Sequence, residues 1–191
     1  MPAAPPPALK YLQGYAPALQ QQALQLLAEG RLGPLLARRY PEAHEVRSDK
    51  ALFDYTQALK TRFMRNAEPL ARVGYDAKLK VIQHALGTHT RSTQQQGARL
   101  KSRREIRIAS LFREAPADFL RMIVVHELAH IREMDHNKAF YQLCQHMEPA
   151  YGQLEFDLRL WLTQREFEAA PGMGEVDAPA LPHSVAGQRQ G

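Results

Sequence analysis

The residues best suited to chemistry lie between positions 126 and 136. His126, Glu127 and His130 form the pattern H-E-x-x-H, and His136 follows His130 at a spacing of six positions. On a helix, residues four positions apart share a face, so His126 and His130 can each direct a ring nitrogen at one zinc ion. Glu127 is rotated about 100° from His126, which places its carboxylate where it can take a proton from zinc-activated water. The spacing predicts a zinc site with His126, His130 and His136 as ligands and Glu127 as the catalytic base.

The third ligand requires the chain to turn after His130. On an unbroken helix, His136 would lie about 15 Å along the axis from His126 and about 80° off its face, too far to reach the same ion. Asp135 directly precedes His136, and a short polar side chain tolerates the left-handed conformation of a tight turn. We therefore expect a helix over residues 116–134, a kink at Asp135, and a return of His136 to the metal.

The composition is that of a globular protein in a reducing compartment. The chain has 191 residues, of which 45% are hydrophobic, and a net charge of +5. This length predicts one domain or at most two. The single Cys144 excludes an internal disulfide framework. The N-terminus lacks a basic segment followed by an apolar one, and no apolar run approaches the roughly 20 residues of a spanning helix. We expect a cytoplasmic protein without a membrane segment.

Helical patterns dominate the N-terminal third. Residues 1–16 begin with a Pro/Ala-rich stretch and are expected to form a disordered tail. Amphipathic patterns predict helices over residues 17–29, from Pro34 onward, and over residues 49–66, the last with Ser48 as its N-cap. Stripes of this kind are typical of core packing, so they indicate no site.

The second half of the chain mixes strand and helix patterns. Residues 77–84 suggest a strand, and residues 103–109 alternate between polar and apolar side chains, as a half-buried strand does. After the H-E-x-x-H helix, we expect helices over residues 137–147 and 152–167. Residues 168–191 are rich in Pro, Gly and Ala, which predicts a flexible tail.

These elements predict an α+β fold: a mostly helical zincin-like domain with a small β-sheet next to the H-E-x-x-H helix. We expect a single domain over residues 17–167, with a helical N-terminal part over 17–70 and a catalytic core over 77–167. The strand before the H-E-x-x-H helix could bind an extended peptide along its edge through backbone hydrogen bonds. Residues 105–110 are the candidate for that edge, and a plain sheet strand is the alternative.

The segment over residues 126–141 resembles the YgjP-like metallopeptidase family. The recurring pattern of that family is H-E-L-x-H, then Asn-His, a small polar residue, and Phe-Trp; here Asp135 replaces the Asn and Tyr141 the Trp. The likeness covers residues 104–151, whereas the helical N-terminus departs from the β-rich start and the Trp-Gly-Ser-Cys stretch of the family. The SprT-like proteases, which digest proteins crosslinked to DNA, are similar in their minimal zincin core. The resemblance implies a zinc peptidase whose ligands and catalytic acid/base are, by position, His126, His130, His136 and Glu127.

Two other functions compete with a zinc-dependent peptidase acting on a protein or peptide. A metal-dependent hydrolase of phosphoanhydrides such as nucleotides would suit the local basic cluster, although the chain has no Gly-rich phosphate-binding loop. A DNA-associated protease or binding module would use the same cluster for weak contact with nucleic-acid phosphates. A solvated strand face is the plainer interpretation. The cluster consists of Arg99, Lys101, Arg103, Arg104 and Arg107.

Several further residues could serve the reaction. A hydrogen-bond donor beside the zinc would stabilise the negative charge that develops on the substrate oxygen. The candidates, which the sequence does not rank, are Tyr141, Tyr151, His89 and Arg107. Met147 could form an apolar floor beneath the metal or belong to the core. His84, His89 and His146 are expected to be ordinary histidines rather than ligands.

Overall fold

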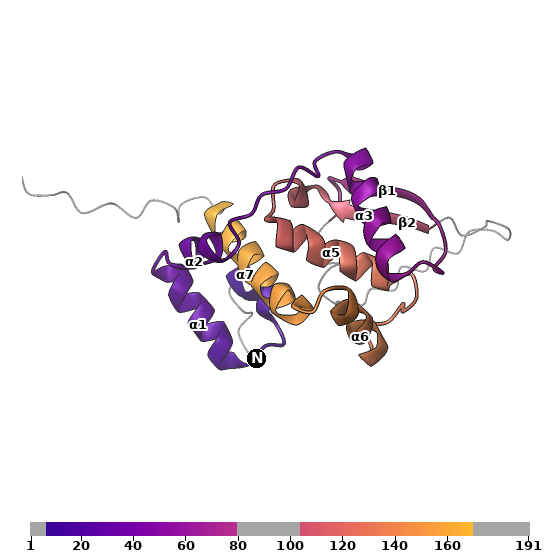
Figure 1. Ribbon diagram of the computed structural model, residues 1–191. Helices are drawn as coiled ribbons and strands as arrows, with labels where there is room; N and C mark the ends of the chain where they lie inside the picture. The colour runs from indigo at the N-terminus through magenta and orange to yellow at the C-terminus, as the bar shows by residue number, and fades with distance from the viewer. Residues whose placement is uncertain (1–6, 80–103, 170–191) are drawn as a thin grey trace, which may run out of the picture.

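The computed structural model of the chain describes residues 7–79 and 104–169, which form helices around one central helix, α5 (Figure 1). The bounds of the short 3-10 helices, α-helices and strands, in chain order, are η1 Pro7–Leu12, α1 Pro17–Ala28, α2 Leu32–Arg39, α3 Asp49–Phe63, β1 Leu70–Asp76, β2 Arg104–Ala109, η2 Ser110–Arg113, α5 Ala117–Ala129, α6 Lys138–Met147 and α7 Tyr151–Ala169.

Helix α5 is almost fully enclosed by the other elements. Its middle consists of a continuous apolar run, and residues 122–126 are all buried. It contacts α7 on one side, α3 and β2 on another, and α6 near its C-terminal end. A helix that is apolar on most of its surface is stable only inside a core, so the H-E-x-x-H residues are carried by the most enclosed helix of the described fold.

The small sheet lies next to this helix. Strand β2 contacts α5 and pairs in parallel with β1, with Val73 opposite Ile106 and Tyr75 opposite Ile108. Figure 1 shows both strands on the same side of α5 as α3, away from α1 and α2. The predicted fold class, a mostly helical α+β domain with a small sheet beside the H-E-x-x-H helix, is confirmed.

The strand predictions were only half right. Strand β2 agrees with the alternation over residues 103–109. By contrast, residues 77–79 follow β1 and form no strand, while residues 80–84 lie outside the described residues. Strand β1 has no counterpart among the predicted strands, because its burial does not alternate and its pairing is irregular between Leu70 and Arg72. Nonlocal pairing therefore makes this segment a strand, where local pattern gives no signal.

The prediction of a disordered tail over residues 1–16 is wrong for residues 7–16. Leu12 is 1% exposed and Leu9 is also buried, both within the main core. Lys10 forms an ion pair with Glu166 of α7, and the Arg159 guanidinium donates a hydrogen bond to the Tyr11 carbonyl at 3.1 Å. The Pro/Ala-rich composition suggested disorder, but η1 places Leu9 and Leu12 in the core against α7.

The remaining helices follow the predicted boundaries closely. Helix α3 begins after Ser48, whose hydroxyl accepts a hydrogen bond from the Ala51 amide at 3.1 Å. Helix α1 ends before Gly30, which adopts a positive φ of 66°. Helices α6 and α7 lie within two residues of their predicted ends. In the part of the chain that the structure describes, no helix is long and apolar enough to cross a membrane.

Candidate metal centre

The C-terminal end of α5 carries the first two histidines. His126 lies in the last turn of the helix and is 2% exposed, and His130 is the helix C-cap. The helix ends at Ala129, so the prediction that it continues to about residue 134 is wrong. Residues 131–133 instead fold back in a turn, in which the amides of Arg132 and Glu133 both donate to the Ala129 carbonyl at 3.0 Å.

The third histidine comes from the segment between this turn and α6. The Asn137 amide donates to the Asp135 carbonyl at 2.8 Å, which closes a tight bend around His136. The Asn137 side chain then caps α6 by accepting from the Phe140 amide at 2.9 Å. The start of α6 thus anchors the chain directly after His136.

The structure brings the three predicted histidines together. The Nε2 atom of His126 lies 3.2 Å from that of His130 and 3.2 Å from that of His136. Ligand atoms of all three lie within 4.8 Å of one another, so the group could hold a metal ion. Nitrogen ligands at about 2.05 Å from a tetrahedral zinc ion lie about 3.3 Å apart. The observed separations fit that arrangement.

Hydrogen bonds on the outer side of the rings determine which nitrogen is available. His130 Nδ1 lies 2.9 Å from the Glu133 carbonyl oxygen, which can only accept, so Nδ1 carries the hydrogen. In the neutral ring, Nε2 of His130 then presents a lone pair to the other two histidines. Lone pairs that face each other at this distance repel unless a cation lies between them, so the local chemistry favours a bound metal ion.

Burial keeps the imidazoles in the neutral form that binds metals. Desolvation, with the neighbouring His130 and His136, lowers the pKa of His126 well below its usual value. Desolvation also lowers the pKa of His130, despite the opposing hydrogen bond to Glu133. Neutral imidazole is the metal ligand, so at neutral pH these two rings need no deprotonation before they bind an ion.

Phe140 packs against all three rings. Its ring centroid lies 5.0 Å from that of His126 and 4.7 Å from those of both His130 and His136, and the residue is completely buried. For Met147, such an apolar floor was one of two interpretations, the other being a core residue. Phe140 occupies that place, whereas Met147 is a buried core residue of α6.

Glu127 follows His126 on α5. Within the described residues, no side chain or backbone group forms a hydrogen bond or ion pair with its carboxylate. Burial raises the pKa of Glu127 to about 8, and a cation close to the carboxylate would oppose this shift. An unpaired carboxylate in such surroundings is suited to proton transfer.

The structure also distinguishes between the candidate hydrogen-bond donors to the substrate by their exposure and position. Tyr151 is 1% exposed, and its hydroxyl lies 2.7 Å from His126 Nδ1, on the outer side of the ring. Tyr141 is 38% exposed, and its ring centroid lies 6.4 Å from that of His136. Arg107 forms an ion pair with Asp76 at 3.0 Å. Of these three side chains, Tyr141 is the one that is both open to solvent and next to the histidines.

The other histidines and the basic cluster are only partly described. His146 packs edge-on against Phe63, with centroids 5.7 Å apart, and does not join the three-histidine group. Arg107 is engaged by Asp76. The predictions for His84, His89, Arg99, Lys101 and Arg103 fall outside the described residues.

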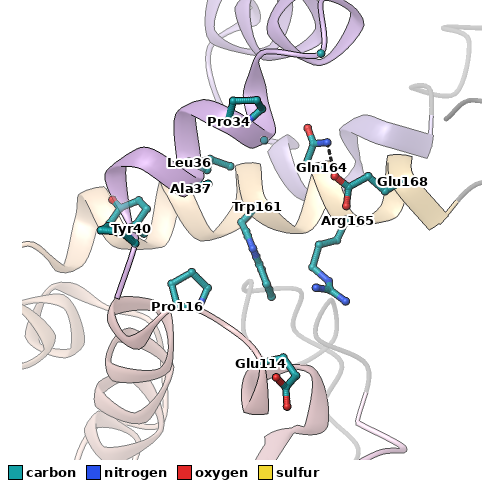
Figure 2. A pocket seen from close by; sticks show the side chains of 13 residues that line it. Pro34, Leu36, Ala37, Tyr40, Glu114, Pro116, Trp161, Gln164, Arg165 and Glu168 are labelled. Atoms are coloured by element: carbon teal, nitrogen blue, oxygen red, sulfur yellow. Dashed lines mark hydrogen bonds between the residues drawn. The ribbon is translucent and has the colours of Figure 1, made fainter. Parts of the chain in front are cut away.

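A separate cavity of about 630 Å³ lies at the opposite end of α5 (Figure 2). Figure 2 shows Trp161 and Arg165 of α7 pointing toward the segment with Glu114 and Pro116 that leads into α5. Helix α5 is 13 residues long, or about 20 Å, and Pro116 and His130 flank its two ends. This cavity is therefore remote from the histidines and includes none of them.

An H-E-x-x-H helix and a third histidine on an α+β scaffold define a class of metal-dependent hydrolases. The chain matches the model of the YgjP-like, metallopeptidase domain family over residues 75–160, which include the three histidines and Glu127. It is 60% identical over 156 residues to the UTP pyrophosphatase of Escherichia coli (strain K12), a match that covers 82% of this chain and 93% of the relative. The chain belongs to the YgjP-like family. No solved structure matches it significantly.

Proposed function

We propose that this protein is a zinc-dependent nucleotide pyrophosphatase that hydrolyses UTP to UMP and pyrophosphate. The observation that carries the proposal is the 60% identity to the UTP pyrophosphatase of Escherichia coli. An aligned stretch of 156 residues within 191 must include residues 36–156, wherever it begins. The relative therefore shares the region that contains the complete three-histidine group.

The proposed ligands are His126, His130 and His136. Three neutral imidazole nitrogens suit zinc and leave one position of a tetrahedral site for water or substrate. When bound, the ion would lower the pKa of a water molecule and neutralise charge on a phosphate oxygen. His130 and His136 are only partly buried, so a substrate could approach from their side.

Glu127 is the proposed general base. Its carboxylate would accept a proton from the attacking water as the water oxygen bonds to the α-phosphorus. The bond between that phosphorus and the bridging oxygen breaks, and pyrophosphate leaves with the bridging oxygen. Atoms and charge balance as UTP plus water gives UMP, pyrophosphate and a proton. The unpaired state of the carboxylate supports this role.

Two cations lie near the site, together with two acids, Glu133 and Asp135, in the segment between them. Arg132 and Lys138 are exposed and flank the turn that brings His136 to the group. Exposed cations at this position would attract a nucleoside triphosphate and raise its local concentration.

The direct test is hydrolysis of UTP by the purified chain with zinc, followed by chromatographic separation of UMP and pyrophosphate. We expect Glu127→Gln to bind zinc as the unaltered protein does and to lose roughly 10²–10⁴-fold in rate, the usual contribution of a general base. Glu45→Gln, an exposed change elsewhere, is the matched control and should be active. Retention of full UTP hydrolysis by Glu127→Gln would contradict the assigned role, and no hydrolysis of UTP by the unaltered protein would contradict the function.

A peptidase is the second candidate, favoured by the metallopeptidase description of the matching family model. Glu127 beside a metal site suits amide hydrolysis as well as phosphoanhydride hydrolysis. Strand β2 could contribute, because β1 is its partner along one edge among the described strands. Cleavage of casein that requires zinc and Glu127, together with inactivity on UTP, would support this alternative.

A further inference from the structure

Tyr151 lies directly behind the metal centre, on a different helix from the ligands. It is the first residue of α7, and its hydroxyl is 2.7 Å from Nδ1 of His126. The two rings are nearly parallel, with an interplanar angle of 16° and centroids 6.4 Å apart. Both side chains are buried, Tyr151 at 1% exposure and His126 at 2%.

The direction of this hydrogen bond follows from the geometry on the other side of the ring. Nε2 of His126 faces the Nε2 atoms of His130 and His136, so it is the nitrogen available to an ion. A neutral imidazole that binds through Nε2 carries its hydrogen on Nδ1. Nδ1 therefore donates to the Tyr151 oxygen.

The Tyr151 hydroxyl in turn has its own neighbour. Burial raises the pKa of Tyr151, and the nearby Glu155 and Cys144 add to the effect, so the phenol keeps its hydrogen. Cys144 is completely buried on α6. The phenol oxygen thus faces His126 Nδ1 from within the core, where water cannot replace it as the partner of that nitrogen.

Tyr151 cannot reach a substrate from this position, because the phenol is buried and faces the outer side of His126. His130 has an outer partner of another kind, the backbone carbonyl of Glu133 in its own turn. The most buried ligand instead depends on a side chain 25 residues further along the chain.

We infer that Tyr151 is a positioning residue of the metal centre, which orients His126 and keeps its hydrogen on Nδ1. The inference rests on the proposed metal site but not on the identity of the substrate. Outer partners of ligating histidines typically contribute about 10–100-fold to metal affinity. Tyr151 would thereby couple metal binding to the packing of α7.

The test is titration of the purified full chain with Co²⁺, read from the visible absorption of the bound ion, followed by competition with Zn²⁺. Tyr151→Phe removes the hydroxyl and retains the ring, and we expect it to lower the affinity for both ions by roughly 10–100-fold. The Co²⁺ spectrum should also change, because His126 loses its fixed orientation. Tyr75→Phe is the matched control: it removes a phenol that donates to the Val46 carbonyl at 2.6 Å and should leave affinity and spectrum unchanged.

Circular dichroism would establish that both variants fold. Metal affinity within twofold of the unaltered protein, with the same Co²⁺ spectrum, would overturn the inference and leave the proposed function intact. Unchanged affinity with a lower kcat at saturating metal would also overturn it, because that result assigns the phenol to the substrate. Failure of the unaltered protein to bind Co²⁺ would overturn both this inference and the proposed metal site.

Discussion

Neighbouring side chains hold the three imidazoles of the candidate centre in place. Glu133 and Tyr151 contact the outer nitrogens of His130 and His126, and Phe140 packs against all three rings. Side chains held in this way lose little conformational entropy on binding a ligand. The same contacts orient the rings so that their Nε2 atoms face one another, as ligands of one ion would.

His136 provides the sharpest test at the scale of residues. We expect His136→Ala to abolish stoichiometric zinc binding, because two imidazoles remain where a catalytic zinc site needs three protein ligands. Activity on UTP should disappear with the metal. Metal content after dialysis, measured by atomic absorption, checks the first expectation.

The matched control is His146→Ala, since His146 packs against Phe63 and lies outside the group. It should retain zinc and activity. Zinc bound at full stoichiometry by His136→Ala would show that the ion lies elsewhere.

The sequence was most informative about these side chains and less so about their surroundings. The i, i+4 spacing places His126 and His130 on one helical face whatever the rest of the fold does. The partners behind the rings could not be inferred in the same way, because Tyr151 reaches His126 only through the packing of α7 on α5. Tyr151 was therefore considered as a donor to the substrate, a role that its burial excludes.

At the scale of elements, the hydrophobic pattern and the capping residues predicted where most helices lie. They did not predict helix ends that depend on contacts with other parts of the fold. Ser48 marks the start of α3 by capping it, as its sequence position predicts. Helix α5 ends earlier than its apolar pattern indicates, because the turn over residues 131–133 takes the Ala129 carbonyl. Strand β1 was missed because its burial does not alternate and its pairing with β2 is irregular between Leu70 and Arg72. Pairing with a strand about 30 residues away leaves no periodic pattern in the local sequence.

Asn137 tests whether the start of α6 positions the third histidine. Asn137→Ala removes the cap of α6, where the side chain accepts from the Phe140 amide at 2.9 Å. We expect a loss of about 1 kcal/mol in the free energy of unfolding and, in addition, weaker zinc binding, since His136 directly precedes the cap. Urea denaturation and zinc competition measure the two effects separately.

Ser48→Ala is the appropriate comparison, because it removes a cap of the same kind from α3. It should cost a similar free energy and leave zinc affinity unchanged. Equal zinc affinities in the two variants would refute the proposed link between the cap and His136.

At the scale of the whole molecule, α7 joins the N-terminal elements to the metal centre. Its first residue contacts His126, and further along the helix Asp157 is buried and accepts a hydrogen bond from Tyr40. Arg39 at the end of α2 lies 3.2 Å from the same carboxylate. The buried apolar side chains form one cluster that extends from Leu9 to Leu162. The N-terminal segment is thus part of the structure that supports the site.

Leu12 allows this integration to be measured. Leu12 is 1% exposed in the core, and Leu12→Ala should lower the free energy of unfolding by about 2–5 kcal/mol, as large-to-small changes in cores do. Leu19→Ala makes the same chemical change on α1, where Leu19 is 41% exposed, and should stay within about 0.5 kcal/mol of the unaltered protein. Urea denaturation of both variants gives the comparison. If residues 7–16 were a loose tail in solution, the two substitutions would have equally small effects, and the packing of η1 on α7 would be refuted.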